Sequence, residues 1–440
     1  MNNTYSVVSL FAGCGGKDLG FHRAGFKISW ANDCDAAACL TYKANISPHI
    51  VLGDIRSIPS KSIPPADVVI GGFPCQGFSI VGTRRLDDER NFLYREMKRI
   101  IRDIRPAFFV AENVRGLLNM EGGKVIAAML AEFRSLGYKV DYRLLNACQF
   151  GVPQNRERVF IIGNRLGLQN PFPEPSHMHS ATHWTQPSLF APQKVVYGRY
   201  MTMRDAIGDL ELLGGLPNHE IDAEWQVKHP EWLAIMRHIG EGQKLCNVRL
   251  GPRSVYTWDI PEVFGPATKA ERKMLTVIAA NRRHKQYGQN DGNPLPERII
   301  CELSRVSNPQ KVLRSLVKKE YVVKSGAGFE LKNAFNGIFR RLRWDKPSEA
   351  VLTVFDSPRY YMHPSQHRPF SVREAARIQG FPDEFIFYGT LKEQYTQVGN
   401  AVPPTLAEAV GREIRAALAT WNHAQYSNSE TALTVGATQS

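Results

Sequence analysis

The stretch 6–16, Ser-Val-Val-Ser-Leu-Phe-Ala-Gly-Cys-Gly-Gly, decides the fold of this chain. Its apolar first half predicts a buried strand, and the glycines that follow predict a loop before a helix. Glycines at this point let the backbone approach a ligand closely, next to the N-terminus of the helix. Because a glycine-rich loop is often only a tight turn, its meaning depends on the rest of the sequence.

The first third of the chain alternates short apolar runs with helical patterns. The apolar runs are at 6–10, 27–31, 67–70, 107–111, 139–145 and 158–163, and the helical patterns are at 17–24, 35–44, 91–104 and 124–136. This alternation predicts the α/β class, with a mostly parallel, doubly wound sheet covered by helices on both faces. Ligands of such sheets bind outside the carboxyl ends of the strands.

Composition limits the class of protein. A chain of 440 residues has room for one large domain and a second, smaller one. Its net charge of +13 favours a polyanionic partner, although a merely basic enzyme would carry it too. The seven cysteines are scattered without a Cys-x-x-Cys pair, which favours a reducing cytoplasm and argues against a zinc site. We expect no signal peptide, no membrane-spanning segment, and no metal at His177, His179 and His183, which we interpret as part of a solvated loop.

Two acidic residues follow later strands of the predicted sheet. Asp33 ends the second strand, where a carboxylate can hold ribose hydroxyls, and Asp54 ends the third, where it can accept from an adenine amino group. Together with the glycine-rich loop they predict a pocket for a nucleoside cofactor. The Gly-x-x-x-x-Gly-Lys phosphate-binding signature is missing, which favours a nucleoside without a triphosphate.

A thiol and a carboxyl group lie at the ends of two further apolar runs. Cys75, in Pro-Cys-Gln-Gly at 74–77, follows the run 68–73, and Glu112 follows the run 107–110. A thiolate can add to a pyrimidine ring while an acid protonates or hydrogen-bonds the ring nitrogen that gains charge. The two groups therefore predict covalent catalysis on a pyrimidine base.

Three long polar side chains precede the strand expected at 158–163. Alternate residues of an extended chain face the same side, so Gln154, Arg156 and Arg158 are expected to converge. Two guanidinium groups could hold a phosphate or a base carbonyl. A surface strand with salt bridges would show the same pattern, and these residues alone leave both interpretations open.

The middle of the chain loses the alternation and becomes richer in Lys and Arg. Thr268-x-x-Glu271 is a capping-box signature that opens a helix. Further helices are expected at 296–304 and from 308, followed by a hairpin at 321–332. Three helices and a hairpin resemble a winged helix whose basic third helix could enter the major groove of DNA. The alternative is an amphipathic helix with a solvated basic face.

Six short signatures follow one another in a characteristic order. They are at 11–16, 74–79, 112–114, 154–158, 368–383 and 397–404. With this order and spacing the chain resembles the bacterial-type DNA (cytosine-5) methyltransferases, except in its middle region and its tail. The resemblance implies a Rossmann-like, S-adenosylmethionine-dependent methyltransferase domain with a second, smaller target-recognition domain.

The resemblance also implies domain boundaries. We expect the first part of the catalytic domain at 1–200 and a target-recognition domain at 201–343, which contains the winged-helix-like segment 268–332. A return segment and a C-terminal helix at 344–422 would complete the catalytic domain. We expect a disordered tail at 423–440. Asn400, late in the chain, would thus return to the cofactor pocket, with its helix beside the first helix.

S-adenosyl-L-methionine is the cofactor that the resemblance implies. The positions that match cofactor-binding residues of the family are Phe11, Gly13, Cys14, Gly15, Gly16, Asp33, Cys34, Asp54, Ile55, Pro74, Leu93, Asn400 and Ala401. Three positions depart from the family pattern: Cys34 replaces an aromatic side chain, Ala401 a small polar one and Lys17 an apolar or aromatic one. These differences could weaken cofactor affinity, and none removes a catalytic group.

The family's chemistry maps onto four residues. Cys75 would attack C6 of a cytosine flipped out of the duplex, and Glu112 would contact N3 and the exocyclic amine. Arg158 would hold the cytosine carbonyl, and Arg156 would support the loop near the thiolate. The DNA contacts that we expect are Gln76, Ser79, Arg84, Arg85, Lys311, Arg314 and Lys318.

The predicted function is sequence-specific methylation of cytosine C5 in double-stranded DNA, in a restriction-modification system or as an orphan methylase. Two alternatives stay open: a tRNA cytosine-5 methyltransferase and a catalytically silent DNA-binding regulator. We expect a monomer in the bacterial cytoplasm, associated with the nucleoid while it acts on DNA, and no membrane contact. A cognate restriction endonuclease, acting separately, is an open partner.

Overall fold

The structure is a computed structural model that describes residues 4–74, 93–179, 183–186, 193–210, 215–221, 224–287 and 294–436. Backbone contacts divide the chain into two compact units. Unit 1 comprises Met1–His219, Asp345–Thr353 and Val372–Ser440, and unit 2 comprises Glu220–Trp344 and Val354–Ser371. Within the described residues, no helix is long and apolar enough to cross a membrane.

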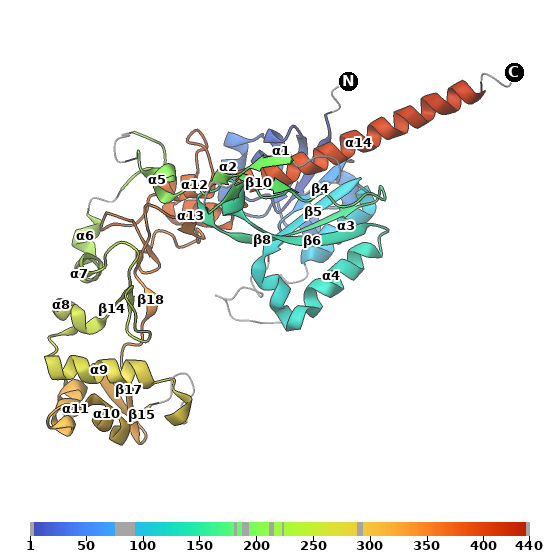
Figure 1. The fold of residues 1–440 in the computed structure, drawn as a ribbon. Coiled ribbons are helices and arrows are strands. Elements are labelled where there is room, and N and C mark those ends of the chain that lie inside the picture. Colours follow the sequence, from blue (N-terminus) through green and yellow to red (C-terminus); the bar gives the residue numbers. More distant parts are fainter. Residues whose placement is uncertain are drawn as a thin grey trace. The chain divides into compact units, whose positions relative to one another are not determined.

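Unit 1 is built on a seven-stranded sheet in the order β3-β2-β1-β4-β5-β8-β6. These strands are β1 (Ser6–Leu10), β2 (Lys27–Asp33), β3 (Ile50–Leu52), β4 (Val68–Gly71), β5 (Phe108–Val114), β6 (Lys139–Asn146) and β8 (Glu157–Asn164). Neighbouring strands from β3 to β5 are parallel, and β8 runs antiparallel to both β5 and β6. The predicted α/β fold with a mostly parallel sheet is confirmed (Figure 1).

Helices cover both faces of this sheet. The helices of unit 1 are α1 (Gly16–Arg23), α2 (Ala36–Asn45), α3 (Leu93–Ile104), α4 (Lys124–Arg134), α5 (Met203–Ile207), α12 (Val372–Gln379), α13 (Leu391–Asn400) and α14 (Pro404–Gly436). Val8 packs into one core with side chains of α3 and α4, and its neighbour Val7 packs into the other with side chains of α1 and α14. Because successive side chains of a strand point to opposite faces, each apolar run supplies both cores.

The last helix lies beside the first. A Cβ atom on Gly20 of α1 would lie 2.4 Å from the main-chain oxygen of Pro404, so the close approach of α14 requires glycine there. Asn400 ends the preceding helix, α13, so the helix that lies beside α1 is the next one after it. The helix α14 extends to Gly436, whereas the sequence predicted a disordered tail from 423. Residues 412–435 contain neither glycine nor proline, and nothing in them therefore breaks the helix.

The boundaries between the units differ from the predicted ones. Residues 201–219 belong to unit 1, where Asn218 Nδ2 donates to the main-chain oxygen of Phe387 at 2.9 Å and the buried Arg373 donates to that of Pro217 at 3.0 Å. Residues 354–371 belong to unit 2 instead of the predicted return segment. Both differences rest on contacts between segments far apart in the sequence.

Short elements complete unit 1 and form most of unit 2. Unit 1 also contains β7 (Gln154–Asn155), β9 (His177–Met178), β10 (His183–Gln186), β11 (Gln193–Val196), β12 (Gly198–Arg199) and β20 (Ser348–Glu349). Unit 2 contains α6 (Trp225–Lys228), α7 (Pro230–His238), α8 (Pro261–Phe264), α9 (Lys269–Asn281), α10 (Glu297–Ser304) and α11 (Pro309–Lys318). Its strands are β13 (Lys244–Cys246), β14 (Ser254–Val255), β15 (Leu295–Pro296), β16 (Val322–Ser325), β17 (Gly328–Leu331), β18 (Asn336–Ile338), β19 (Arg340–Arg341) and β21 (Tyr361–Met362).

Unit 2 has two apolar cores. One lies around α6, α7, β13, β14 and β21, where the buried Arg341 donates hydrogen bonds to main-chain oxygens of Met236 and His363 at 2.8 and 2.7 Å. The other lies under α9, α10 and α11 and the sheet β15-β17-β16. The three helices and the hairpin predicted from the sequence are therefore present. The structure adds β15, a strand between the first and second of these helices, and thus gives the order helix, strand, helix, helix, strand, strand.

A buried carboxylate holds the first and third of these helices together. Glu271 closes the predicted capping box by accepting from the main-chain nitrogen of Thr268 at 2.7 Å. The same side chain accepts from Ser315 Oγ and Lys319 Nζ, both at 2.8 Å, at the end of α11. Glu271 therefore caps one helix and fixes the position of another.

We predict that acid weakens this part of unit 2. Burial raises the pKa of Glu271, but the hydrogen bonds from Lys319, Thr268 and Ser315 outweigh burial and hold this pKa at about 2. Because the pKa is depressed relative to the unfolded chain, the ionised carboxylate stabilises the fold above about pH 5. As the pH falls towards 2, a contribution on the order of 3 kcal/mol is lost.

Hydrogen–deuterium exchange of peptides from 268–332, corrected for the intrinsic rate at each pH, measures this loss. In the E271Q variant we expect weaker protection at neutral pH and little further change on acidification. The E302Q variant changes an exposed carboxylate of α10 and serves as the matched control. Equal acid sensitivity of the wild type and E271Q would contradict the prediction.

Candidate active site

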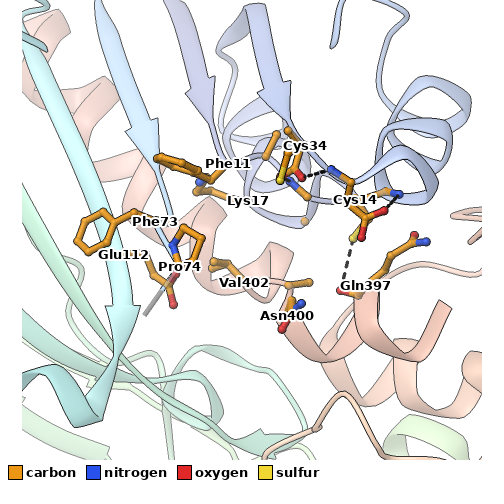
Figure 2. Close-up of a pocket in the computed structure, with 18 of the residues that line it drawn as sticks. Phe11, Cys14, Lys17, Cys34, Phe73, Pro74, Glu112, Gln397, Asn400 and Val402 are labelled. Atoms are coloured by element: carbon orange, nitrogen blue, oxygen red, sulfur yellow. Dashed lines mark hydrogen bonds between the residues drawn. The ribbon is translucent and has the colours of Figure 1, made fainter. Parts of the chain in front are cut away.

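A cavity of about 600 Å³ opens at the carboxyl ends of β1, β2, β4 and β5 in unit 1. The glycine-rich loop, the ends of β2 and β5 and the segment that follows β4 form part of its wall, and residues 396–402 form another part. Figure 2 shows side chains from these segments around one space. The cavity lies where ligands of parallel α/β sheets bind.

The glycine-rich loop has left-handed backbone conformations at several of its residues. Phe11, Gly13 and Gly15 have positive φ angles of 52°, 56° and 96°. The main-chain nitrogen of Gly13 donates to Asp33 Oδ2 at 2.7 Å, which ties the loop to the end of β2. No atom lies within 4 Å of the place where a Cβ of Gly13 would be, so a ligand can approach this backbone closely.

The two predicted cofactor-binding acids both line the cavity but differ in their surroundings. Burial raises the pKa of Asp33, whereas hydrogen bonds from the main-chain nitrogens of Asp35 and Gly13 lower it. Asp54 is more exposed, and its side-chain and main-chain hydrogen bonds from Arg56 lower its pKa. The guanidinium of Arg56 lies 2.7 Å from Asp54 Oδ2, so Arg56 is a neighbour of Asp54 that the sequence did not predict.

The late segment of the chain returns to the cavity as predicted for Asn400. Asn400 and Ala401 line the cavity together with Gln397, whose main-chain oxygen lies 3.7 Å from the buried Cys14 Sγ. Burial raises the pKa of the Cys14 thiol to about 12. Gln397 Oε1 is buried and has no hydrogen-bond partner within the described ranges.

The structure brings Glu112 and Arg158 together. They lie on the neighbouring antiparallel strands β5 and β8, and Arg158 Nε is 3.0 Å from Glu112 Oε1. Both side chains are nearly buried, and burial lowers the pKa of Arg158 while the charge of Glu112 raises it. A carboxylate and a guanidinium fixed side by side can contact adjacent polar atoms of one planar base.

Arg156 also lines the cavity, but its guanidinium is engaged by main-chain oxygens. Its guanidinium donates hydrogen bonds to the main-chain oxygens of Val351, Gly399 and Ala401 at 2.8, 2.6 and 3.0 Å. The predicted convergence of the three polar side chains is therefore limited: Gln154 accepts from the main-chain nitrogen of Val351 at 3.0 Å, beside Arg156, while Arg158 reaches Glu112. Residue 156 falls between β7 and β8, and this break in the pairing turns its side chain inward.

Asn113 positions the segment that leads to the predicted nucleophile. Its Nδ2 donates to the main-chain oxygen of Phe73 at 3.2 Å, two residues before Cys75. The sequence contained this signal in the Glu-Asn-Val signature at 112–114, but Asn113 was not among the predicted site residues. Pro74 lines the cavity, whereas Cys75 lies outside the described residues.

The remaining predicted residues fall into three groups. The cofactor-binding residues that line the cavity are Phe11, Gly13, Cys14, Gly16, Asp33, Cys34, Asp54, Ile55, Pro74, Leu93, Asn400 and Ala401, while Gly15 belongs to the same loop. The predicted DNA contacts Gln76, Ser79, Arg84 and Arg85 lie outside the described residues. Lys311, Arg314 and Lys318 are exposed on α11 of unit 2. Over the described ranges, no group of three or more His, Cys, Asp or Glu side chains is placed to hold a metal ion.

Comparison with known proteins identifies the family. The family model for C-5 cytosine-specific DNA methylases matches residues 5–416. The chain belongs to this family. It is 35% identical to the Type II methyltransferase M.AgeI of Thalassovita gelatinovora, over 94% of this chain and 99% of that protein. It is 34% identical to the Type II methyltransferase M.XorII of Xanthomonas oryzae pv. oryzae, over 93% of this chain and 84% of that protein.

A solved structure shares the fold. It is described as a DNA modification methyltransferase encoded within an E. coli prophage, is 24% identical in sequence, and matches with a TM-score of 0.52 over 93% of this chain and 98% of that one. Family membership confirms the resemblance found in the sequence. The chain is an S-adenosylmethionine-dependent DNA methyltransferase that acts on cytosine C5, and the family assignment favours DNA over the tRNA alternative and an enzyme over the silent regulator.

We predict that Arg156 controls cofactor affinity through the backbone that it holds. Lysine keeps the charge but cannot donate to three carbonyl oxygens in the geometry of a guanidinium. In the R156K variant we expect the affinity for S-adenosylhomocysteine to fall by about tenfold or more, because Gly399 and Ala401 lose their fixed positions. A buried carbonyl left without its donor costs about 1–3 kcal/mol.

Isothermal titration calorimetry with S-adenosylhomocysteine measures the affinity without requiring turnover. The R143K variant, in which an exposed arginine of β6 paired with Glu174 is replaced, is the matched control. Wild-type affinity in R156K would show that the backbone at 399–401 does not depend on this side chain.

Proposed function

We propose that this chain methylates C5 of a cytosine within one short recurring sequence of double-stranded DNA, with Cys75 as the nucleophile. The observation that carries the proposal is the Glu112–Arg158 pair, which lies in the same cavity as the glycine-rich loop and Asp33. Pro74, which directly precedes Cys75, lines that cavity. A thiolate after Pro74 would thus meet a base held by Glu112 and Arg158.

The proposed reaction begins when the target cytosine leaves the duplex, which costs a few kcal/mol. The Cys75 thiolate forms a bond to C6, and the electrons of the C5–C6 double bond move into the ring. Glu112 contacts N3 and the exocyclic amine where charge develops, and Arg158 holds the ring carbonyl. After C5 has gained its methyl group, loss of the C5 proton restores the double bond and releases Cys75.

The residues around the cavity fit S-adenosylmethionine, which supplies the methyl group when bound. The open backbone at Gly13 suits the polar amino-acid end. Asp33 would accept from the ribose hydroxyls and Asp54 from the adenine amino group. Cys34 lines the same wall, and its short side chain gives the adenine less stacking surface than an aromatic ring would.

We predict that expression of this chain in a methylation-free bacterial host places 5-methylcytosine at one recurring sequence. Base-resolution mapping of the host DNA measures this directly. The C75A variant should bind duplex DNA and form no methylated product, because it lacks the attacking sulfur. Methylated DNA from cells that express C75A would show that the nucleophile is a different residue.

We further propose that unit 2 reads the target sequence through a winged helix. The order α9, β15, α10, α11, β16, β17 is that of a winged helix, and α11 is the third of its helices. Leu313 and Leu316 of α11 are buried in the core, while Lys311, Arg314 and Lys318 are exposed on one stripe of the helix. The helix contains no acidic residue, so this stripe would meet the phosphates and base edges of a major groove without repulsion.

We predict that the exposed cations of α11 make two kinds of DNA contact, some with phosphates and others with bases. Removing a phosphate contact at Lys311 or Lys318 should weaken binding to all sequences and lower the salt dependence by about one counterion. Removing a base contact at Arg314 should cost about 1–3 kcal/mol and relax the sequence preference. Electrophoretic mobility shifts over a salt series, with target and scrambled duplexes, separate the two effects.

The K332A variant is the control for these substitutions. Lys332 follows β17 of the same segment, and its ammonium is engaged with Glu320 at 2.7 Å. We expect near-wild-type affinity and salt dependence for K332A. Unchanged binding in the K311A, R314A and K318A variants would place DNA reading on another surface of the protein.

We propose that the enzyme serves a restriction-modification system, because its relatives at 34% and 35% identity are named Type II methyltransferases. A cognate restriction endonuclease would then act separately on the same sequence. We propose that the methyltransferase acts as a monomer on DNA of the bacterial nucleoid, since the substrate is one duplex site. An orphan methylase would methylate the same sequence without such an endonuclease.

A further inference from the structure

Lys17 places a positive charge in the cavity. Neither the proposed cofactor binding nor the proposed reaction uses this charge. It is the second residue of α1, directly after the glycine-rich loop, and lines the cavity with 3% of its surface exposed. The family pattern has an apolar or aromatic residue here. A buried ammonium costs free energy unless a counter-charge and hydrogen bonds compensate it. The position of Lys17 therefore requires a partner.

The ammonium of Lys17 is only partly satisfied. Nζ donates to the main-chain oxygen of Leu10 at 3.3 Å, and within the described ranges it has no other hydrogen bond. An ammonium group carries three donors. Two donors are thus available to a neighbouring acceptor or to a ligand in the cavity.

Three carboxylates act on this ammonium. Burial lowers the pKa of Lys17, and the charges of Asp18, Glu112 and Asp33 raise it. Both oxygens of Asp18 and both oxygens of Asp33 already accept hydrogen bonds from other groups. Glu112 differs, because Arg158 holds Oε1 whereas Oε2 has no hydrogen bond to any described residue. Glu112 is therefore the acceptor that remains for Lys17.

Glu112 Oε2 and the ammonium of Lys17 both border the small space that a side chain on Gly72 would occupy. A methyl group on Gly72 would lie 3.1 Å from Glu112 Oε2 and 3.6 Å from Lys17 Nζ. The two charged groups therefore lie on either side of one methyl-sized space without direct contact, and opposite charges across such a buried gap attract each other. Both side chains are labelled in the wall of the cavity in Figure 2, and Pro74 lies near them.

We propose that Lys17 is a positioning residue for Glu112. Its ammonium attracts Oε2 while Arg158 holds Oε1, so the carboxylate is oriented at both oxygens before a cytosine arrives. Groups that are oriented in advance stabilise developing charge without reorganising during the reaction. The inference rests on the proposed function, because it assigns Lys17 to the step in which the ring is activated.

Exchange of the C5 hydrogen of the target cytosine isolates that step. Addition of Cys75 to C6 lets C5 take a proton from solvent, and loss of the original C5 hydrogen with release of Cys75 restores the ring. With S-adenosylhomocysteine in place of the methyl donor, tritium release from DNA labelled at cytosine C5 reports this cycle without methyl transfer. Calorimetry with S-adenosylhomocysteine reports cofactor affinity separately.

A double-mutant cycle tests whether Lys17 acts through Glu112. We expect K17M to slow tritium release by about tenfold, K17R to restore part of the rate, and cofactor affinity to stay within about twofold of wild type. In an E112Q background, K17M should cause little further loss, because the group that it positions is already gone. K17M replaces a buried ammonium by an apolar side chain of similar length, so its thermal stability should equal or exceed that of wild type.

Several results would overturn the inference. An undiminished rate in K17M, equal losses from K17M in the wild-type and E112Q backgrounds, or a loss explained by weaker cofactor binding would each do so. If K17M lost its folded structure, tritium release would be measured in K17R and G72A instead. The methyl group of G72A enters the space between the two charges. Wild-type protein that neither exchanges tritium nor methylates DNA would instead refute the proposed function itself.

Discussion

The buried guanidinium of Arg156 is the interaction on which the candidate site depends. It joins the break between β7 and β8 to main-chain oxygens that lie 195, 243 and 245 residues further along the chain, at Val351, Gly399 and Ala401. A hydrogen bond to a charged group contributes about 1.5–3 kcal/mol, and a buried carbonyl without its donor loses a comparable amount. Since residues 399–401 form part of the cavity wall, the strand and helix units of the first third cannot complete the site alone. Arg156 thus holds a late segment of the chain that completes the cavity, together with Gln379, which donates to the main-chain oxygens of Val398 and Ala401.

Local patterns in the sequence predicted much of this site, because its chemical groups lie at the ends of successive strands. The alternation of apolar runs predicted the sheet, and the places of Asp33 and Glu112 at strand ends marked them as candidates. Arg158 was predicted from the alternation of polar residues before a strand, and its role came from the family resemblance. The direction of the Arg156 side chain could not be predicted, since extended-chain periodicity ignores the break between β7 and β8. The unit boundaries depended in the same way on long-range contacts such as that between Asn218 and Phe387. The strand β15 has only two residues, too few for any periodic pattern to reveal.

Charge is distributed along the cavity in a way that suits two different occupants. Asp33 and Asp54 line the part of the cavity proposed for the nucleoside; Asp33 accepts hydrogen bonds from two main-chain nitrogens, and Asp54 pairs with the exposed Arg56. Around Glu112 the arrangement is different, since the guanidinium of Arg158 touches one oxygen and the ammonium of Lys17 lies near the other. A neutral base that enters this end meets a carboxylate already flanked by cations. In the proposed reaction, charge that develops on the ring would be balanced by these groups, which are oriented in advance.

In the segment 268–332 of unit 2, the residues that make the fold are distinct from the residues that we propose to face DNA. Its core is internal, because α9, α10, α11 and the three short strands bury one another's apolar side chains. Glu271 fixes α11 from the inside through Ser315 and Lys319, and both of these contacts lie on the side of the helix that faces α9. Lys311, Arg314 and Lys318 contribute nothing to that core, so they can be exchanged for other side chains without loss of the fold.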